Sequence, residues 1–282
     1  MRVTSIVVSL ILSALLISTL AACVRFTDKA RSRYASSVVD YLYPQKEVAE
    51  IPSIPQLSLP LRVGVAFVPE SSRMSRPDSL SEKDKLDLMQ RISAEFRSLP
   101  FVKDIELIPS AYLMPGGSFT NLDQIRTMYG VDVMALLSFD QVQHTDEGLL
   151  SLSYWTIVGA YVIRGEKNDT STMMDAAVYD IASRKMLFRA PGTSHVKGSA
   201  TLVNLPEQLR ADSAEGFSLA ADNLVVNLNG ELQRFQAKVK EQPEEYVVRH
   251  KAGYTGGGSL GGTFALALLG LGGLALWRNK KG

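Results

Sequence analysis

The sequence predicts an α/β (α+β) fold: a single domain built on one mixed β-sheet with helices packed against it, flanked by an N-terminal lipoprotein signal and a C-terminal transmembrane helix. Three observations predict this arrangement. Periodic segments follow one another in the order βαβα-βββ-α, the chain begins with an apolar stretch that ends in a cysteine, and it finishes with an apolar stretch followed by basic residues. The length of 282 residues leaves room for one ordinary domain between two terminal segments.

The first half of the predicted domain alternates strands and helices. LRVGVAFV (61–68) is rich in β-branched residues and predicts a strand. Ser81 can cap a helix whose apolar residues recur at three- and four-residue spacing (Leu86, Met89, Ile92, Phe96, Leu99). DIELIPSAYL (104–113) predicts a second strand.

A short helix marked by Leu122, Ile125 and Tyr129 should then end at Gly130. VDVMALLSFDQV (131–142) follows and is apolar at almost every position up to Phe139. Strands buried on both faces have this composition, so this segment predicts a central strand.

The second half predicts successive antiparallel strands in 150–165, 172–192 and 193–200, and then a long helix. One face of that helix is apolar (Phe217, Ala221, Leu224, Leu228, Phe235, Val239). Within 150–165, alternation places Trp155, Ile157 and Tyr161 on one side of a strand. That side is either a core face, which we favour, or an aromatic contact surface for a partner or a glycan.

Charge and cysteine content exclude several classes of protein. The formal net charge is +1, with 30 Lys and Arg against 29 Asp and Glu. Such a balance gives no long-range field that would attract nucleic acid, so we expect no nucleic-acid partner. Cys23 is the single cysteine, so the chain can form no intramolecular disulfide and no cysteine-based metal site.

The N-terminal segment has the features of an export signal. Arg2 precedes an apolar stretch, and small residues close it. Leu20, Ala21, Ala22 and Cys23 resemble the bacterial lipobox, which implies lipidation at Cys23 by acyl transferases and removal of residues 1–22 by the lipoprotein signal peptidase. A plain export signal or an uncleaved anchor is the alternative. Val24 follows the cysteine, and by the family's rule this favours sorting to the outer membrane.

The C-terminal segment predicts a membrane span. Residues 260–277 carry no charge and would cover about 27 Å as a helix, close to the ~30 Å of a hydrocarbon core. Arg278, Lys280 and Lys281 favour a cytoplasmic tail by the positive-inside tendency, which places the domain outside the cytoplasm. Several glycines weaken this helix by up to about 1 kcal/mol each. They suit either intramembrane proteolysis or a small-residue packing face with GxxxG spacing.

Together the two ends resemble the rhombotail lipoprotein family. The tail is similar to the GlyGly-CTERM sorting tail, the recognition segment of rhombosortase, a rhomboid-type intramembrane serine protease. The resemblance implies processing in a glycine-rich region (Gly256, Gly257, Gly258, Gly261, Gly262). A permanent anchor is the alternative. The order of the domain's elements is also similar to the curli-secretion lipoproteins and to the N-terminal domain of the Tol-Pal translocation protein.

These segments define the expected organisation. It comprises a signal (1–22), a tether (23–56) in which 28–42 has room for a short helix, an extracytoplasmic α/β domain (57–242), a linker (243–259), the membrane helix (260–277) and a basic cytoplasmic tail (278–282).

No stretch predicts a catalytic centre, a metal site or a cofactor site. G-x-G-x-x-G and G-x-S-x-G both occur between Gly256 and Gly261, but neither has the strand-to-helix context that its chemistry requires. His144, His195 and His250 are scattered without ligand spacing. Asp84, Asp87 and Glu95 fit a solvated helix face better than an acid and base pair.

We therefore expect no enzyme and no cofactor, but an exported lipoprotein of a Gram-negative envelope, with membrane lipid bound through Cys23. It would act as a non-enzymatic binding or structural module, held at the inner membrane until its tail is cut and then carried to the outer membrane or cell surface. The alternative is an oligomeric transport or assembly factor that resembles the curli-secretion lipoproteins and keeps its tail as an anchor. Sequence leaves the oligomeric state open.

Overall fold

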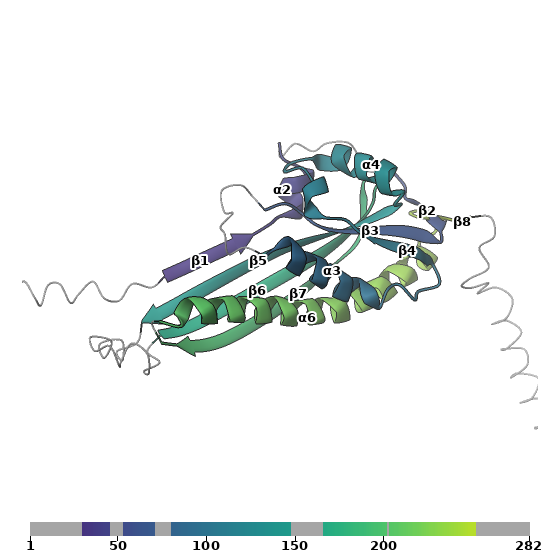
Figure 1. The fold of residues 1–282 in the computed structure, drawn as a ribbon. Coiled ribbons are helices and arrows are strands. Elements are labelled where there is room, and N and C mark those ends of the chain that lie inside the picture. Colours follow the sequence, from purple (N-terminus) through teal and green to yellow (C-terminus); the bar gives the residue numbers. More distant parts are fainter. Residues whose placement is uncertain (1–29, 46–52, 71–79, 148–165, 202, 252–282) are drawn as a thin grey trace, which may run out of the picture.

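The computed structural model describes residues 30–45, 53–70, 80–147, 166–201 and 203–251. They form a mixed α/β domain around a six-stranded sheet, with a separate two-stranded sheet at one end (Figure 1). The strands and helices, in chain order, are β1 (Ala30–Ala35), α2 (Val38–Leu42), β2 (Gln56–Leu59), β3 (Leu61–Phe67), α3 (Glu82–Ala94), β4 (Val102–Leu107), the 3-10 turn η2 (Ser110–Tyr112), α4 (Ser118–Tyr129), β5 (Val133–Glu147), β6 (Glu166–Asp180), β7 (Lys185–Ala200), α6 (Leu205–Glu241) and β8 (Val247–His250).

Strand β5 organises the sheet, whose order is β4-β3-β5-β6-β7. The first residues of β5 pair with β3 in parallel, and residues 140–145 along the same edge pair with β1 in antiparallel register. β6 pairs with the whole of β5, and β7 pairs with β6, both in antiparallel register. The result is a parallel sheet at one end of the molecule that continues into a long antiparallel ribbon at the other (Figure 1).

Helices cover both faces of the parallel end. One core cluster joins α3 and α6 to one face through residues such as Met89, Phe139 and Leu224, and a second joins α2 and α4 to the opposite face through Tyr41, Leu122 and Met134. A third cluster lies beside the two-stranded sheet, where β2 and β8 pair in parallel. All three clusters bury side chains of β3, β5 or both, which explains why these strands read as nearly continuous apolar runs.

Helix α6 lies along the ribbon for its full length (Figure 1). Its 37 residues span about 55 Å, similar to the roughly 50 Å of a 15-residue strand such as β6. The close approach depends on glycine. A Cβ added at Gly192 of β7 would collide with the carbonyl oxygen of Ala220, and one added at Gly216 would lie 2.6 Å from Thr172 Oγ1.

Most elements predicted from the sequence are confirmed. These are the strand at 61–67, the helix capped by Ser81, the short helix that ends at the left-handed Gly130, the central strand and the long helix. The Ser81 hydroxyl accepts a hydrogen bond from the Asp84 amide, as an N-cap should. The predicted strand at 150–165, with its aromatic face, lies outside the described residues.

Three details of the prediction are wrong. The strand expected at 104–113 ends at Leu107, because Pro109 has no amide hydrogen for the ladder and the 3-10 turn follows it. The segment predicted at 172–192 is divided by a turn at 181–184 between β6 and β7, and 193–200 is the continuation of β7, since Pro191 and Gly192 remain paired with β6 at an edge that tolerates proline. Helix α3 ends at Ala94 and exposes Leu86, so Phe96 and Leu99 lie beyond it.

The folded region also extends beyond residues 57–242. Within the expected tether, Ala30–Ala35 forms β1 on the main sheet, and α2, in the part expected to hold a short helix, buries Tyr41 and Leu42. Within the expected linker, β8 pairs with β2. Short polar segments do not show their pairing partners in sequence, which is why the periodicity did not reveal these strands.

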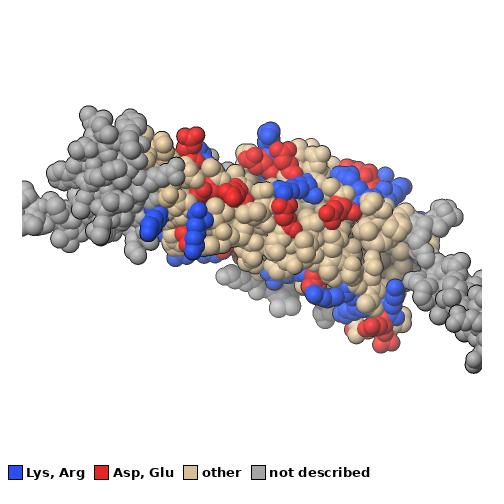
Figure 2. Space-filling view, turned by 90° about the horizontal axis from the view of Figure 1, so that it is seen from below, with Lys and Arg blue, Asp and Glu red and all other residues tan. Residues whose placement is uncertain are grey.

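The surface carries charges of both signs. Figure 2, seen from below the view of Figure 1, shows Lys and Arg interspersed with Asp and Glu on either side of a broad area of other residues. This mixture agrees with the small net charge of +1.

Two glycines of α6 test the close packing of this helix. Gly216→Ala and Gly230→Ala gain the same helix propensity, up to about 1 kcal/mol each. At Gly230 a new methyl group meets nothing within 4 Å, whereas at Gly216 it collides with Thr172. We expect Gly230→Ala to raise the free energy of unfolding and Gly216→Ala to lie roughly 1–3 kcal/mol below it in denaturant titrations. Equal stabilities of the two variants would contradict the packing described here.

Candidate functional site

An open, mostly apolar cavity of about 620 Å³ lies between the sheet and the C-terminal half of α6. Its floor comes from β3, β5 and β6, and its walls come from α6, the end of α3, β7 and the β2–β8 pair. The main lining residues are Leu57, Leu61, Val63, Ile92, Phe96, Leu99, Phe101, Val133, Ala135, Val178, Phe188, Leu228, Leu232, Phe235 and Val239. This volume lies within the range of small-molecule sites, roughly 300–1,000 Å³.

Aromatic side chains of α6 and β7 line part of this cavity. Phe235 of α6 lies against Phe188 of β7 at 5.4 Å between ring centroids and against Tyr246 at the same distance. Phe188 and Phe235 belong to the lining, whereas the close contacts of Gly192 and Gly216 lie nearer the start of α6.

Polar groups on the cavity lining are few. Ser93 is buried, and its hydroxyl already donates to the carbonyl of Gln90. Gln236 and Lys240 of α6 and His250 of β8 are exposed at the rim. The interior can therefore hold apolar atoms, and only the rim offers charge or hydrogen bonds.

At the other end of α6 the contact with the sheet is polar. Gln141 Nε2 donates to Thr172 Oγ1 at 2.8 Å, and Gln141 Oε1 accepts from the Ser213 hydroxyl at 2.6 Å. One step further along β5, Gln143 Nε2 donates to Thr170 Oγ1 at 3.2 Å and to the carbonyl of Leu209 at 2.9 Å. These bonds fix the helix in register on the ribbon.

The same network continues onto β6 and β7. Asn168 donates to the buried carboxylate of Asp212, whose other oxygen accepts from Gln208 Nε2 at 2.8 Å. Ser194 of β7 donates to the carbonyl of Gly216 at 2.7 Å. Each of these side chains thus has a partner on α6 or on the ribbon, which avoids much of the cost of burying polar groups.

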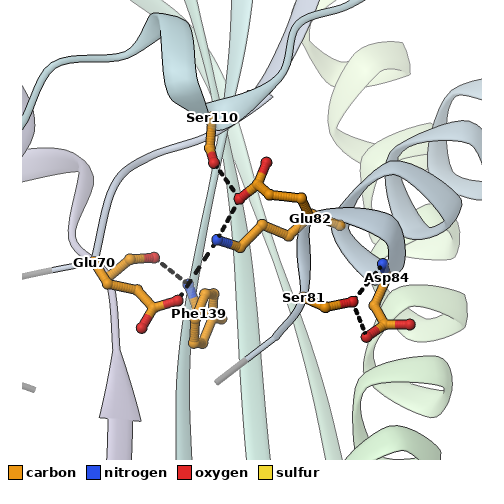
Figure 3. Close-up of polar contacts among 8 residues, drawn as sticks. Glu70, Ser81, Glu82, Asp84, Ser110 and Phe139 are labelled. Atoms are coloured by element: carbon orange, nitrogen blue, oxygen red, sulfur yellow. Dashed lines mark hydrogen bonds and ion pairs between the residues drawn. The ribbon is translucent and has the colours of Figure 1, made fainter. Parts of the chain in front are cut away.

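Two side chains of α3, the buried Lys85 and its neighbour Glu82, connect the helix to Glu70 after β3 and to Ser110 after β4. Lys85 Nζ lies 3.1 Å from Glu82 Oε1 and 3.6 Å from Glu70 Oε1. Ser110 donates to the same oxygen of Glu82, and Figure 3 shows Glu82 lying between Ser110 and Glu70. Partial burial by itself would raise the pKa of Glu82, but the hydrogen bonds from Ser110 and Lys85 outweigh it and lower that pKa.

A second cleft, of about 710 Å³, lies between β1, α3 and the start of α6. Its walls carry both signs of charge, with Arg31 and Arg210 facing Asp84 and Asp87 across apolar residues. Arg91 on the same wall already binds Asp222 at 2.5 Å and Ser218 at 2.6 Å. Asp87 forms an exposed pair with Lys83, and Asp84 accepts from the Ser81 hydroxyl, as expected on a solvated helix face.

The structure brings together one set of residues that sequence spacing did not indicate. On the exposed face of the ribbon, His195 of β7 lies 3.1 Å from Ser171 and 3.1 Å from Asp169, both of β6. Ser171 is paired in the ladder with Val142 on one side and His195 on the other, so the backbone there is committed to the sheet. None of these three side chains lines either of the two cavities described here.

The site residues predicted at the chain ends lie outside the described residues. These are the lipobox with Cys23, the glycines from Gly256 to Gly262, and the basic tail. Among the described residues, no helix is both long and apolar enough to cross a bilayer, and no group of three or more His, Cys, Asp or Glu side chains is placed to hold a metal ion. His144 lies on β5, away from the cavity rim that His250 joins.

Gln141→Ala tests the polar network. The substitution removes the partners of Ser213 and Thr172, so we expect a loss of about 1–3 kcal/mol in the free energy of unfolding, measured by denaturant titration. The control is Gln233→Ala, an exposed glutamine of α6, which should change stability by less than about 0.5 kcal/mol. Comparable losses for the two variants would argue against the network.

Glu82 predicts a dependence of stability on pH. Because its pKa is lower in the folded protein than in the unfolded chain, its contribution is present above the unfolded pKa and is lost as the pH falls through the folded value. Thermal unfolding followed from pH 7 downwards should therefore show a smaller acid loss in Glu82→Gln than in the unchanged protein. An unchanged acid slope in the variant would show that this carboxylate is not stabilised by its neighbours.

Comparison with known proteins gives no family. No protein-family model and no curated protein matches the chain. Among solved structures, the chain is similar to a neuraminyllactose-binding hemagglutinin homolog from Helicobacter pylori, with 10% identity, a TM-score of 0.34 and coverage of 71% of this chain and 97% of that one. It is also similar to a PelC dodecamer from Paraburkholderia phytofirmans, with 11% identity, a TM-score of 0.27 and coverage of 71% and 96%. Likenesses at this level carry no conclusion about the present chain.

Proposed function

We propose that this chain is an exported lipoprotein of a Gram-negative envelope whose domain is a non-enzymatic binding module. Cys23 is acylated, and rhombosortase cuts the tail near Gly256–Gly262. The uncut protein is held at the inner membrane by residues 260–277, and the cut protein travels to the outer membrane or cell surface on its lipid. A lipid chain can be lifted out of a bilayer, whereas a spanning helix with a charged cytoplasmic end is far costlier to extract.

The apolar cavity beside α6 is the observation that carries the binding role. A space of about 620 Å³ whose interior side chains are almost all apolar suits the binding of an apolar ligand, while its charged or titratable side chains, Lys240 and His250, lie at the rim. His195, Ser171 and Asp169 lie on the exposed face of the ribbon and outside this cavity.

The positions of the described ends support two separate attachments. β1 begins beside the distal half of β5, where Ala30 pairs with Thr145, whereas β8 pairs with β2 at the opposite end of the molecule (Figure 1). The segments that lead to Cys23 and to the apolar tail therefore leave from different ends of an elongated domain. Cutting one attachment would leave the other intact.

An oligomeric transport or assembly factor is the second candidate, and the edge of the sheet favours it. β7 is 16 residues long, and within the described residues only β6 pairs with it. Such an edge can add a strand from another copy, although Pro191 and Lys197 are residues that discourage this. Native mass spectrometry separates the candidates, because a ring component should assemble and a binding module need not.

The intact mass of the mature protein, purified from membranes, tests the proposal. We expect a species that begins at an acylated Cys23 and ends before Leu260. Cys23→Ser should lose the acyl mass, and deletion of the protease gene should restore the mass of the tail and retain the protein in the inner-membrane fraction. An unacylated N-terminus, or an outer-membrane species that still carries Trp277, would overturn it.

A further inference from the structure

The interior of the cavity restricts what can occupy it. An extended peptide would bring N–H and C=O groups against leucine, valine and phenylalanine side chains, where each would lack a hydrogen-bond partner. The single buried hydroxyl of its lining, that of Ser93, already donates to Gln90. An occupant without hydrogen-bonding groups along its length, such as a hydrocarbon chain, meets no such penalty.

The rim adds a positive charge at one end of this apolar space. Lys240 and Gln236 lie one turn apart on α6, and His250 lies on β8 opposite them. The neighbouring lysines are engaged: Lys238 lies 3.4 Å from Glu245, and Lys251 lies 2.9 Å from Asp132.

Lys240 differs from these lysines. In the described part of the chain it forms no ion pair, and it is exposed at the cavity mouth. An anion placed here would meet an ammonium group that has no ion-pair partner among the described residues. The cavity thus combines a hydrocarbon interior with a cationic rim, which is the complement of an amphiphile with an anionic head.

We propose that the cavity binds the acyl chain of a long-chain fatty acid, with the carboxylate of the ligand beside Lys240. This inference rests on the proposed role as a binding module and names its ligand class. The hydrocarbon replaces solvent between Ala135 and Val178 on the sheet and Leu232 and Phe235 on α6. The head group remains at the rim, where Gln236 and His250 can contact it.

Photocrosslinking of the full chain in isolated membranes tests this assignment. The probe is a palmitic acid that carries a diazirine in its chain, and crosslinked residues are mapped by peptide mass spectrometry. We expect labels in segments 57–65, 92–105, 133–137 and 228–240, which line the cavity. Unlabelled palmitate should compete for these sites, and shorter fatty acids should compete less well, by about fourfold for each methylene removed.

Two substitutions with matched controls locate the ligand. Ala135→Trp fills the cavity from the sheet and should reduce labelling of these segments at least tenfold, whereas Ala94→Trp on the exposed side of α3 should not. Lys240→Gln should weaken palmitate competition by about two- to fivefold, the range expected for an exposed pair. Lys103→Gln, an exposed lysine of β4 outside the cavity, should leave competition unchanged. If Ala135→Trp unfolds, as limited proteolysis would reveal, the chain-length series on the unchanged protein decides.

Several results would overturn the inference. Crosslinks confined to residues 260–277 would show only that the tail contacts probe in the bilayer. Crosslinks that unlabelled palmitate does not displace would show nonspecific contact with membrane-dissolved probe. If the cavity is labelled only after the apolar tail is deleted, the tail itself occupies the cavity in the full chain. That result would assign the cavity to the tail instead of to a fatty acid. The acylation state of Cys23 is read separately from the intact mass, so failure of the lipoprotein proposal and failure of fatty-acid binding give different results.

Discussion

The contact between α6 and the long ribbon is the interaction on which the rest of this structure depends. Over the first half of the helix, glycines and a matched set of buried hydrogen bonds bring its backbone close to the strands, as at Gly216 against Thr172 and at Ser213 against Gln141. In the second half, Phe235 lies against Phe188 of β7 and against Tyr246, and Leu228, Leu232 and Phe235 line the cavity. The same helix therefore packs against the antiparallel strands with its first half and lines the cavity with its second half.

The fold could be predicted from the sequence further than the site could. Periods of two and of three to four residues mark β3, α3, β5 and α6 because each buries one strong apolar face. β1 and β8 were missed because their pairing is decided by distant partners. The cavity was missed for a related reason, since Ala135 and Val178 look like ordinary core residues and only the spacing of opposed elements leaves room between them. Gln141 and Gln143, two residues apart on β5, were the one sign of the polar network in the sequence. Their role becomes clear only once the fold places Thr172 and Thr170 beside them.

The two halves of α6 also separate stability from function. The polar half fixes the register of helix and ribbon through the hydrogen bonds of Gln141 and Gln143 to α6. The apolar half has few buried hydrogen bonds to the sheet. Its side chains can therefore shift around a ligand while the hydrogen bonds of Gln141 and Gln143 remain intact. β1 begins at one end of the domain and β8 ends at the other, so the cavity lies away from the end where β1 begins.

Amide hydrogen exchange along α6 measures this division most directly. The account predicts slow exchange for residues 213–224, which contact Gln141, Thr172 and Gly192, and faster exchange for residues 229–240 beside the cavity. Added palmitate should slow the second segment and leave the first unchanged. Uniform protection along the helix, or faster exchange in the glycine-contacting half, would contradict the account.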